Sequence, residues 1–240
     1  MGELRDRIQN QGLRGLTSNP SLFDKSITGG ETYRAVIGRG LPQNLSAKAI
    51  YEMLAFADIR QACDTLRPIY EETGGLDGYV SMEVSPHLAR DSAGTLQEAR
   101  RFYQEINRDN VMIKIPGTPE GMSAIEQAIA DGINVNVTLL FSVEMYRQAA
   151  MAYMRGLERR VEAGQSIDRL SSVASFFLSR IDTKIDDRLD ERLQRVGSDT
   201  LNEERRLESV KGKVAIANAK VAYQTVQELV ASDRWQGLAE

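Results

Sequence analysis

Lys114 is the residue of this chain whose surroundings point most directly to chemistry. It lies inside the apolar segment 111–115, which reads as a buried parallel strand. Burial of an amine disfavours its charged form, and a neutral amine attacks ketones and aldehydes to form Schiff bases. The alternative is an amphipathic lysine whose stem packs while its ammonium reaches the rim of a sheet. Lys114 is therefore a candidate Schiff-base lysine, with the rim position as the competing interpretation.

Two further side chains have the types that this chemistry needs. Formation and dehydration of a carbinolamine require proton transfers, so a carboxylate and a hydroxyl that hold a water near the amine are expected. Glu83 and Thr138 end the candidate strands that come before and after the strand of Lys114. Because sequential strands are usually neighbours in a sheet, we expect these two residues to flank the lysine.

Other polar residues follow the ends of candidate strands and suggest a phosphorylated ligand. Ser175 and Arg180 lie near a predicted helix start, where a hydroxyl, a guanidinium and the helix dipole together favour phosphate. Each polar residue also has a structural alternative. Asn19 before Pro20 is typical of an Asx turn, Thr138 could cap a helix, and Arg180 could be a solvated helix residue. The sequence pattern thus favours a sugar phosphate site while leaving these alternatives open.

The elements that must position these residues alternate between strands and helices, as in repeated βα units. Candidate strands cover residues 13–17, 79–84, 111–115, 133–138 and 170–177. Candidate helices cover residues 46–69, 95–106, 119–130, 142–163, 181–193 and 204–229. Helix starts are predicted at Thr118-Pro119 and at Ser142. This order fits either an open doubly wound sheet or part of a closed (β/α)8 barrel, and no glycine fingerprint of a dinucleotide or P-loop site is present.

Composition limits the classes of function. The chain has 240 residues, 42% of them hydrophobic and 27% charged, and a net charge of −4, which fits one globular domain over residues 1–240. Without a basic stripe, no nucleic-acid partner is expected. The longest apolar stretches are too short for a membrane span, and the charged N-terminus is unlike a signal peptide. The single cysteine, Cys63, is expected in the core, so we predict a cytoplasmic protein.

The chain resembles the transaldolase family over about residues 3–229. Five segments carry the resemblance: GLTSNPSLF (15–23), VSMEV (80–84), VMIKIPGTPEG (111–121), INVNVTLLFS (133–142) and ASFFLSR (174–180). It implies a TIM (β/α)8 barrel that moves a dihydroxyacetone unit between sugar phosphates in the pentose phosphate pathway. Sedoheptulose 7-phosphate and glyceraldehyde 3-phosphate would give erythrose 4-phosphate and fructose 6-phosphate. No metal or organic cofactor is implied.

The resemblance also implies a role for each candidate residue. Lys114 would form the Schiff base with the donor ketose, while Glu83 and Thr138 would position a catalytic water. Asn19 and Asn136 would hydrogen-bond the dihydroxyacetone moiety, and Ser175 and Arg180 would bind the phosphate. Phe177 would line the site.

The chain departs from the family at both ends. The family's general acid/base aspartate lies on a first barrel strand that would precede the helix beginning near Glu3, and no segment after Leu229 corresponds to the seventh and eighth strands. We therefore expect a chain truncated at both ends that supplies about five of the eight βα units, the second to the sixth. Two alternatives to a working transaldolase follow: an impaired fragment or non-catalytic remnant, and an aldolase that cleaves sugar phosphates. The sequence leaves a homodimer open.

Overall fold

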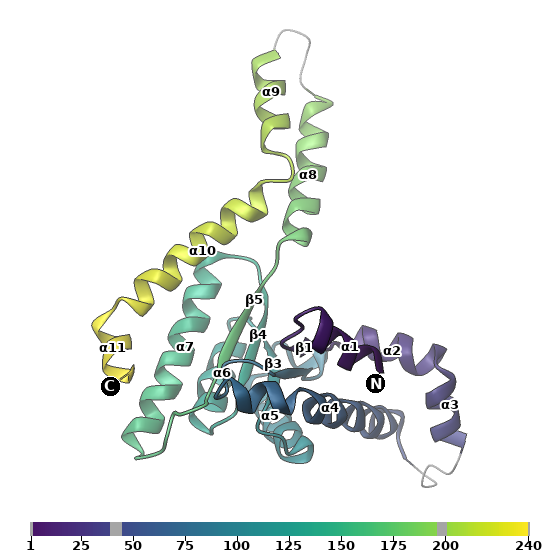
Figure 1. Ribbon diagram of the computed structural model, residues 1–240. Coiled ribbons are helices and arrows are strands. Elements are labelled where there is room, and N and C mark those ends of the chain that lie inside the picture. Colours follow the sequence, from purple (N-terminus) through teal and green to yellow (C-terminus); the bar gives the residue numbers. More distant parts are fainter. Residues whose placement is uncertain (1, 39–44, 196–200, 240) are drawn as a thin grey trace.

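The computed structural model describes residues 2–38, 45–195 and 201–239. In this part of the chain five strands form one parallel sheet (Figure 1). They are β1 (Leu16–Thr17), β2 (Val80–Glu83), β3 (Val111–Pro116), β4 (Val135–Leu140) and β5 (Ser172–Phe176). The strands lie side by side in chain order, β1-β2-β3-β4-β5. A doubly wound sheet reverses its strand order at a switch point. The observed order therefore excludes the doubly wound alternative and favours part of a (β/α)8 barrel.

The helices occupy the intervals between these strands and the segments before and after them. They are α1 (Gly2–Asn10), α2 (Pro20–Gly29), α3 (Glu31–Gly38), α4 (Ala47–Glu72), the short 3-10 helix η1 (Pro86–Leu88), α5 (Ser92–Ile106), α6 (Gly121–Ala130), α7 (Val143–Glu162), α8 (Ser179–Leu193), α9 (Leu201–Val210), α10 (Val214–Val230) and α11 (Asp233–Ala239). Along the sheet, α4 contacts α5, α5 contacts α6, and α6 contacts α7. Consecutive crossover helices therefore cover one face of the sheet as neighbours.

Helix starts follow the local chemistry of the sequence, with one difference from expectation. Ser142 caps α7, as predicted, because its hydroxyl accepts from the backbone N–H of Met145. The predicted start at Thr118-Pro119 is displaced, and regular α6 begins at Gly121. The Thr118 hydroxyl accepts from the Gly121 N–H and donates to the carbonyl of Ala89. Thr118 thus ties the turn before α6 to the loop that follows η1.

The helix predicted over residues 204–229 is two helices. α9 ends at Val210 and α10 begins at Val214. Between them Gly212 has a φ of +65°, a left-handed conformation that glycine adopts without steric cost and that ends a helix. Asp186 of α8 accepts a hydrogen bond from the Gly212 N–H. The change of direction at this glycine returns the chain from the α8–α9 hairpin to α10, which packs on α7 and α8.

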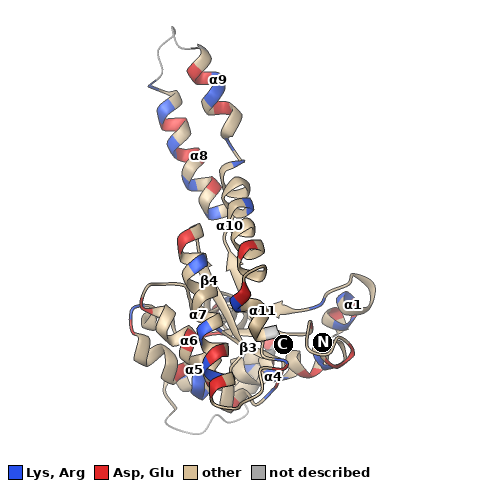
Figure 2. Ribbon diagram, turned by 90° about the vertical axis from the view of Figure 1, so that its left-hand side faces the viewer, with Lys and Arg blue, Asp and Glu red and all other residues tan. Residues whose placement is uncertain are grey.

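The α8–α9 hairpin projects away from the sheet, and Figure 2 shows charged residues of both signs along both helices. No residue of α8 is buried. Arg192 of α8 pairs with Glu203 of α9 at 2.6 Å, with both side chains exposed. Such exposed pairs contribute about 0–1 kcal/mol each. Among the described residues, no helix is both long enough and apolar enough to cross a membrane.

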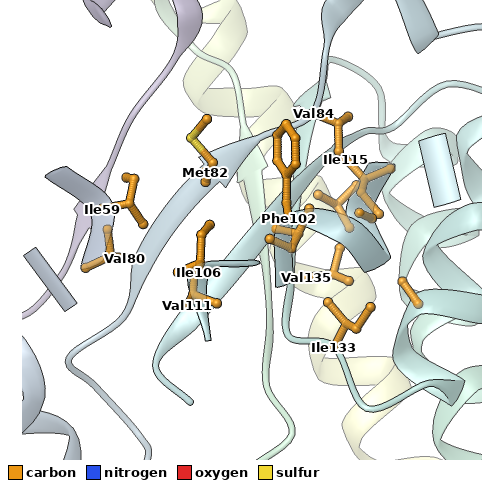
Figure 3. Packing of buried hydrophobic residues seen from close by; sticks show 14 of the residues in the cluster. Ile59, Val80, Met82, Val84, Phe102, Ile106, Val111, Ile115, Ile133 and Val135 are labelled. Atoms are coloured by element: carbon orange, nitrogen blue, oxygen red, sulfur yellow. The ribbon is translucent and has the colours of Figure 1, made fainter. Parts of the chain in front are cut away.

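The apolar core lies between the sheet and its covering helices. Figure 3 shows Phe102 and Ile106 of α5 among the β3 residues Val111 and Ile115, and all four are at most 2% exposed. Cys63 of α4 belongs to the same cluster, as predicted. Burial raises the pKa of its thiol to about 12. The cysteine is therefore a small apolar core residue rather than a reactive thiolate.

Strand alternation places polar side chains on the face of the sheet away from these helices. In β2, Val80 and Met82 join the apolar cluster, so Ser81 and Glu83 point to the opposite face. The parallel register places Glu83 beside Lys114 and Lys114 beside Asn136. Residues paired in register share a face. One polar row therefore crosses the second, third and fourth strands.

Candidate active site

Lys114 and Glu83 form the centre of this polar row. The Lys114 ammonium nitrogen lies 3.1 Å from a carboxylate oxygen of Glu83. It also donates to the backbone carbonyl of Ser18, just beyond β1, at 3.1 Å. Lys114 is 7% exposed. The structure thus brings the lysine and its expected carboxylate partner together, and it places the ammonium in a buried position rather than at an exposed rim of the sheet.

Asn136 lies beside Lys114 on β4, and two serine hydroxyls hold its amide. Its nitrogen donates to the Ser81 hydroxyl at 3.0 Å, and its oxygen accepts from the Ser175 hydroxyl at 2.8 Å. The side chain is buried. Because both ends of the amide are bonded, its orientation is fixed before any ligand arrives.

Thr138 shares the face of Asn136, two residues further along β4 toward the mouth of the sheet. It is 3% exposed and pairs in register with Pro116. Because it lies within the strand, the helix-cap alternative does not apply. Within the described residues its hydroxyl makes no hydrogen bond to Lys114 or Glu83. The structure thus places Thr138 in the same row as the pair, without a direct contact to it.

Asn19 has the structural role that its Pro20 neighbour suggests. Its side-chain oxygen accepts from the Leu22 N–H at 2.9 Å and caps α2. It directly follows Ser18, whose carbonyl binds Lys114. Asn19 is therefore held at the edge of the site, with one end of its amide already engaged.

The expected phosphate residues are only partly brought together. Ser175 is bonded to Asn136 at the inner end of β5. Arg180 is the second residue of α8 and is exposed. Its guanidinium carbon lies 4.7 Å from the ring centroid of Phe177, which stacks on Phe141 with centroids 5.1 Å apart. Arg180 is thus positioned through Phe177 rather than through Ser175, at the N-terminal end of α8.

Two residues of the site had no predicted role. Ser81 holds both the Asn136 amide, through its hydroxyl, and the Ser18 hydroxyl, through its carbonyl at 2.8 Å. Its position two residues before Glu83 on one strand was a usable signal, because such residues share a face. Ser18 acts on Lys114 through its backbone carbonyl. A backbone acceptor leaves no signature in the sequence.

We expect Ser81→Ala to slow reaction of Lys114 with a ketose phosphate by about tenfold at low ketose concentration. The substitution removes the acceptor of a buried amide, which costs about 1–3 kcal/mol. The rate of borohydride-trapped adduct formation measures the effect. Ser172→Ala is the matched control, because this β5 hydroxyl donates to the Val135 carbonyl and has no other side-chain hydrogen bond within the described residues. Equal rates for Ser81→Ala and the wild type would show that this hydrogen bond does not orient the site.

The Tyr51 phenol beside Glu83 stays protonated at neutral pH. Burial, followed by the negative charge of Glu83, raises the pKa of Tyr51 to about 12. Tyr51 and Glu83 line one cavity of about 620 Å3. In the described ranges no cluster of three or more His, Cys, Asp or Glu side chains could hold a metal ion. The polar row itself brings together an amine, a carboxylate, an amide and hydroxyls.

A buried lysine bonded to a carboxylate at the ends of parallel strands is the arrangement expected for Schiff-base chemistry. A family model described as Transaldolase/Fructose-6-phosphate aldolase matches residues 1–235. The chain belongs to this family. Its sheet, with strands in chain order, is the corresponding part of the family's (β/α)8 barrel.

Individual members of the transaldolase family are similar over nearly the whole chain. Transaldolase 2 of Nostoc sp. (strain PCC 7120) is 56% identical over 238 residues, which are 99% of this chain and 62% of that protein. Transaldolase of Trichodesmium erythraeum is 55% identical with the same coverage. Transaldolase of Acidothermus cellulolyticus is 44% identical over 242 residues, 99% of this chain and 61% of that protein. The chain thus spans about 62% of the length of the curated relatives it matches.

Proposed function

We propose that this chain carries the Schiff-base site of a transaldolase, which transfers a dihydroxyacetone unit between sugar phosphates. The observation that carries the proposal is the buried contact of Lys114 with Glu83, 3.1 Å apart. In the direction from fructose 6-phosphate, the donor would give up glyceraldehyde 3-phosphate and the acceptor would be erythrose 4-phosphate. The product would then be sedoheptulose 7-phosphate, as in the pentose phosphate pathway.

The chemistry begins with attack of the Lys114 amine on the ketone carbon of the donor. The resulting carbinolamine loses its hydroxyl as water and becomes an iminium ion. Cleavage of the bond between C3 and C4 releases the aldose phosphate, the C4 hydroxyl proton passes to a base, and the electron pair stays on C3 as an enamine. Addition of this carbon to an acceptor aldehyde, followed by hydrolysis, returns the free lysine.

The row of polar residues supplies the remaining roles. Glu83 exchanges the protons that carbinolamine formation and dehydration require, and with Thr138 it holds the water that is released and later consumed. Asn136, whose amide is already oriented, and Asn19 hydrogen-bond the hydroxyls of the dihydroxyacetone unit. For the phosphate we propose Ser175 and Arg180, with Phe177 as the wall that fixes the guanidinium.

Two observations favour a catalytic role over a non-catalytic remnant. The three transaldolases described above are 44–56% identical over nearly all of this chain. Lys114 and Glu83 also form a largely inaccessible ion pair, with side chains that are 9% and 13% exposed. A buried ion pair is a weak source of stability, so its presence in this chain fits chemistry better than folding. We further propose a single domain that acts in the cytoplasm, in keeping with a lone core cysteine.

A transfer assay tests this proposal. Incubation of the protein with fructose 6-phosphate and erythrose 4-phosphate should yield glyceraldehyde 3-phosphate and sedoheptulose 7-phosphate in equal amounts. Without the acceptor, product should stop at the concentration of enzyme sites. Continuous release of free dihydroxyacetone would instead indicate the cleavage reaction that the family description also names. No product of either kind from a folded sample would contradict the catalytic proposal.

A further inference from the structure

Glu98 of α5 is a buried carboxylate outside the polar row. It is 6% exposed, and each of its oxygens accepts a hydrogen bond. One oxygen accepts from the Lys48 ammonium of α4 at 2.7 Å. The other accepts from the backbone N–H of Ser85. A buried carboxylate that binds a backbone N–H fixes the chain at that point, because charge-assisted hydrogen bonds are the stronger ones.

Ser85 follows the candidate catalytic carboxylate by two residues. Between them, Val84 donates its N–H to the carbonyl of Lys114 at 3.2 Å, which is the last bond between β2 and its neighbour. The two residues that follow Glu83 are therefore both held through their backbone N–H groups, Val84 by the strand of Lys114 and Ser85 by Glu98. The direction in which the Glu83 side chain leaves the backbone depends on both bonds.

Packing alone does not keep Glu83 against Lys114. Glu83, Ser85 and Glu98 all line the cavity of about 620 Å3 beside the pair. A carboxylate at the wall of such a cavity has room to turn away from the ammonium. The backbone bond from Ser85 to Glu98 restricts that movement, because it fixes the residue from which the strand end turns into η1.

Glu98 is itself held in place by charge. Its hydrogen bond raises the pKa of Lys48 above the ordinary lysine value. Arg101 lies 3.6 Å from Glu98 and pairs with Glu52 at 2.7 Å. Arg101 also pairs with Glu105 at 3.1 Å, so two cations are shared among three carboxylates in this cluster. The Glu98 carboxylate is compensated without using Lys114, so the catalytic pair and this cluster are separate.

We propose that Glu98, clamped by Lys48, is a positioning residue for Glu83, and that it sets the contact of Glu83 with Lys114 by holding the backbone of Ser85. The inference rests on the proposed Schiff-base function. Glu98 touches no reacting atom; it acts on the rate through Glu83 alone.

The test is the rate at which borohydride traps fructose 6-phosphate on this protein. Glu98→Ala should lower the rate at saturating ketose by at least about tenfold, since small misplacements of catalytic groups are costly. The half-saturating concentration should not change, because the substrate-binding residues lie elsewhere. Glu126→Ala is the matched control, because Glu126 of α6 pairs with Arg155 of α7 away from any strand end. It should react at the wild-type rate.

A double-mutant cycle separates positioning from a general effect on structure. In a Glu83→Gln background, adding Glu98→Ala should lower the rate by no more than about twofold, because residues that act as one unit are not additive. A purely structural contribution would lower the rate as much in that background as in the wild type. Additive losses, or a wild-type rate for Glu98→Ala, would overturn the inference.

A second pair of variants covers the case in which Glu98→Ala does not fold. In Glu98→Gln the amide oxygen can accept from the Ser85 N–H, but the amide nitrogen then faces the Lys48 ammonium. Both of these groups are hydrogen-bond donors, so neither finds an acceptor in the other. This variant should be slow, and adding Lys48→Met should return the rate to within about twofold of wild type. Failure of that rescue in a folded double variant contradicts the inference.

The same measurement separates the inference from the proposed function. If the wild type forms no adduct, the proposed function fails and the inference fails with it. If the adduct forms at a rate that Glu98 does not affect, only the inference is refuted.

Discussion

Lys114→Ala should abolish the borohydride-stable adduct with fructose 6-phosphate and the transfer reaction with it. The amine of Lys114 is the one that the structure places beside a carboxylate in the buried polar row. Without it no iminium ion forms there, and the route through a covalent intermediate is closed. Intact-mass analysis after borohydride reduction measures the loss.

The control for this substitution is an exposed lysine on a different element. Lys184 lies on α8 and faces solvent, so Lys184→Ala should form the adduct as the wild type does. Removing Lys114 also leaves Glu83 without its cation, which in buried pairs costs about 3–5 kcal/mol. Circular dichroism should therefore accompany the measurement. An adduct that persists in folded Lys114→Ala would refute the assignment of this lysine.

Glu83→Gln should lower the rate of adduct formation by about a hundredfold, within the range for loss of a general acid/base group. Glutamine keeps the size of the side chain and an oxygen that can accept from Lys114. It cannot exchange the protons that carbinolamine formation and dehydration need. The adduct should still form slowly, and at the same lysine. A rapid-quench time course at saturating fructose 6-phosphate measures the rate.

Glu126→Gln serves as the companion variant for this measurement. Glu126 is also an ion-paired carboxylate, bonded to Arg155 at 2.6 Å, but it lies on α6 outside the polar row. Its substitution should leave the rate unchanged. If Glu83→Gln reacts as fast as Glu126→Gln, Glu83 pairs with the lysine for structural reasons and another group exchanges the protons.

The order of strands and helices could be predicted for much of the chain, because short apolar segments alternate with long amphipathic segments in the sequence. Four of the five predicted strands match β2 to β5 within about two residues at most ends, a usual boundary error. The first was predicted over residues 13–17, whereas β1 is only Leu16–Thr17. Propensity cannot set the length of an edge strand that pairs on one side. The break at Gly212 was also missed, because a single glycine is tolerated in many helices.

The site was predictable where side-chain type and strand order suffice. The expectation that Glu83 flanks Lys114 is confirmed, because sequential strands are neighbours and their register pairs these residues. Distances between side chains depend on register and rotamer, which no sequence pattern contains. Arg180 therefore contacts Phe177 rather than Ser175, and Thr138 stands apart from the pair. The Ser18 contact could not be predicted, since a backbone carbonyl supplies it.

The measurement that tests the central claim most directly is peptide mapping of the wild-type chain after borohydride reduction in the presence of fructose 6-phosphate. We predict a single modified peptide, the one that contains Lys114. A dihydroxyacetone adduct would show Schiff-base formation and carbon–carbon cleavage, and an adduct that retains the whole hexose would show Schiff-base formation alone. A folded chain with no modified peptide, or with modification at other lysines only, would contradict the claim that Lys114 is the Schiff-base lysine.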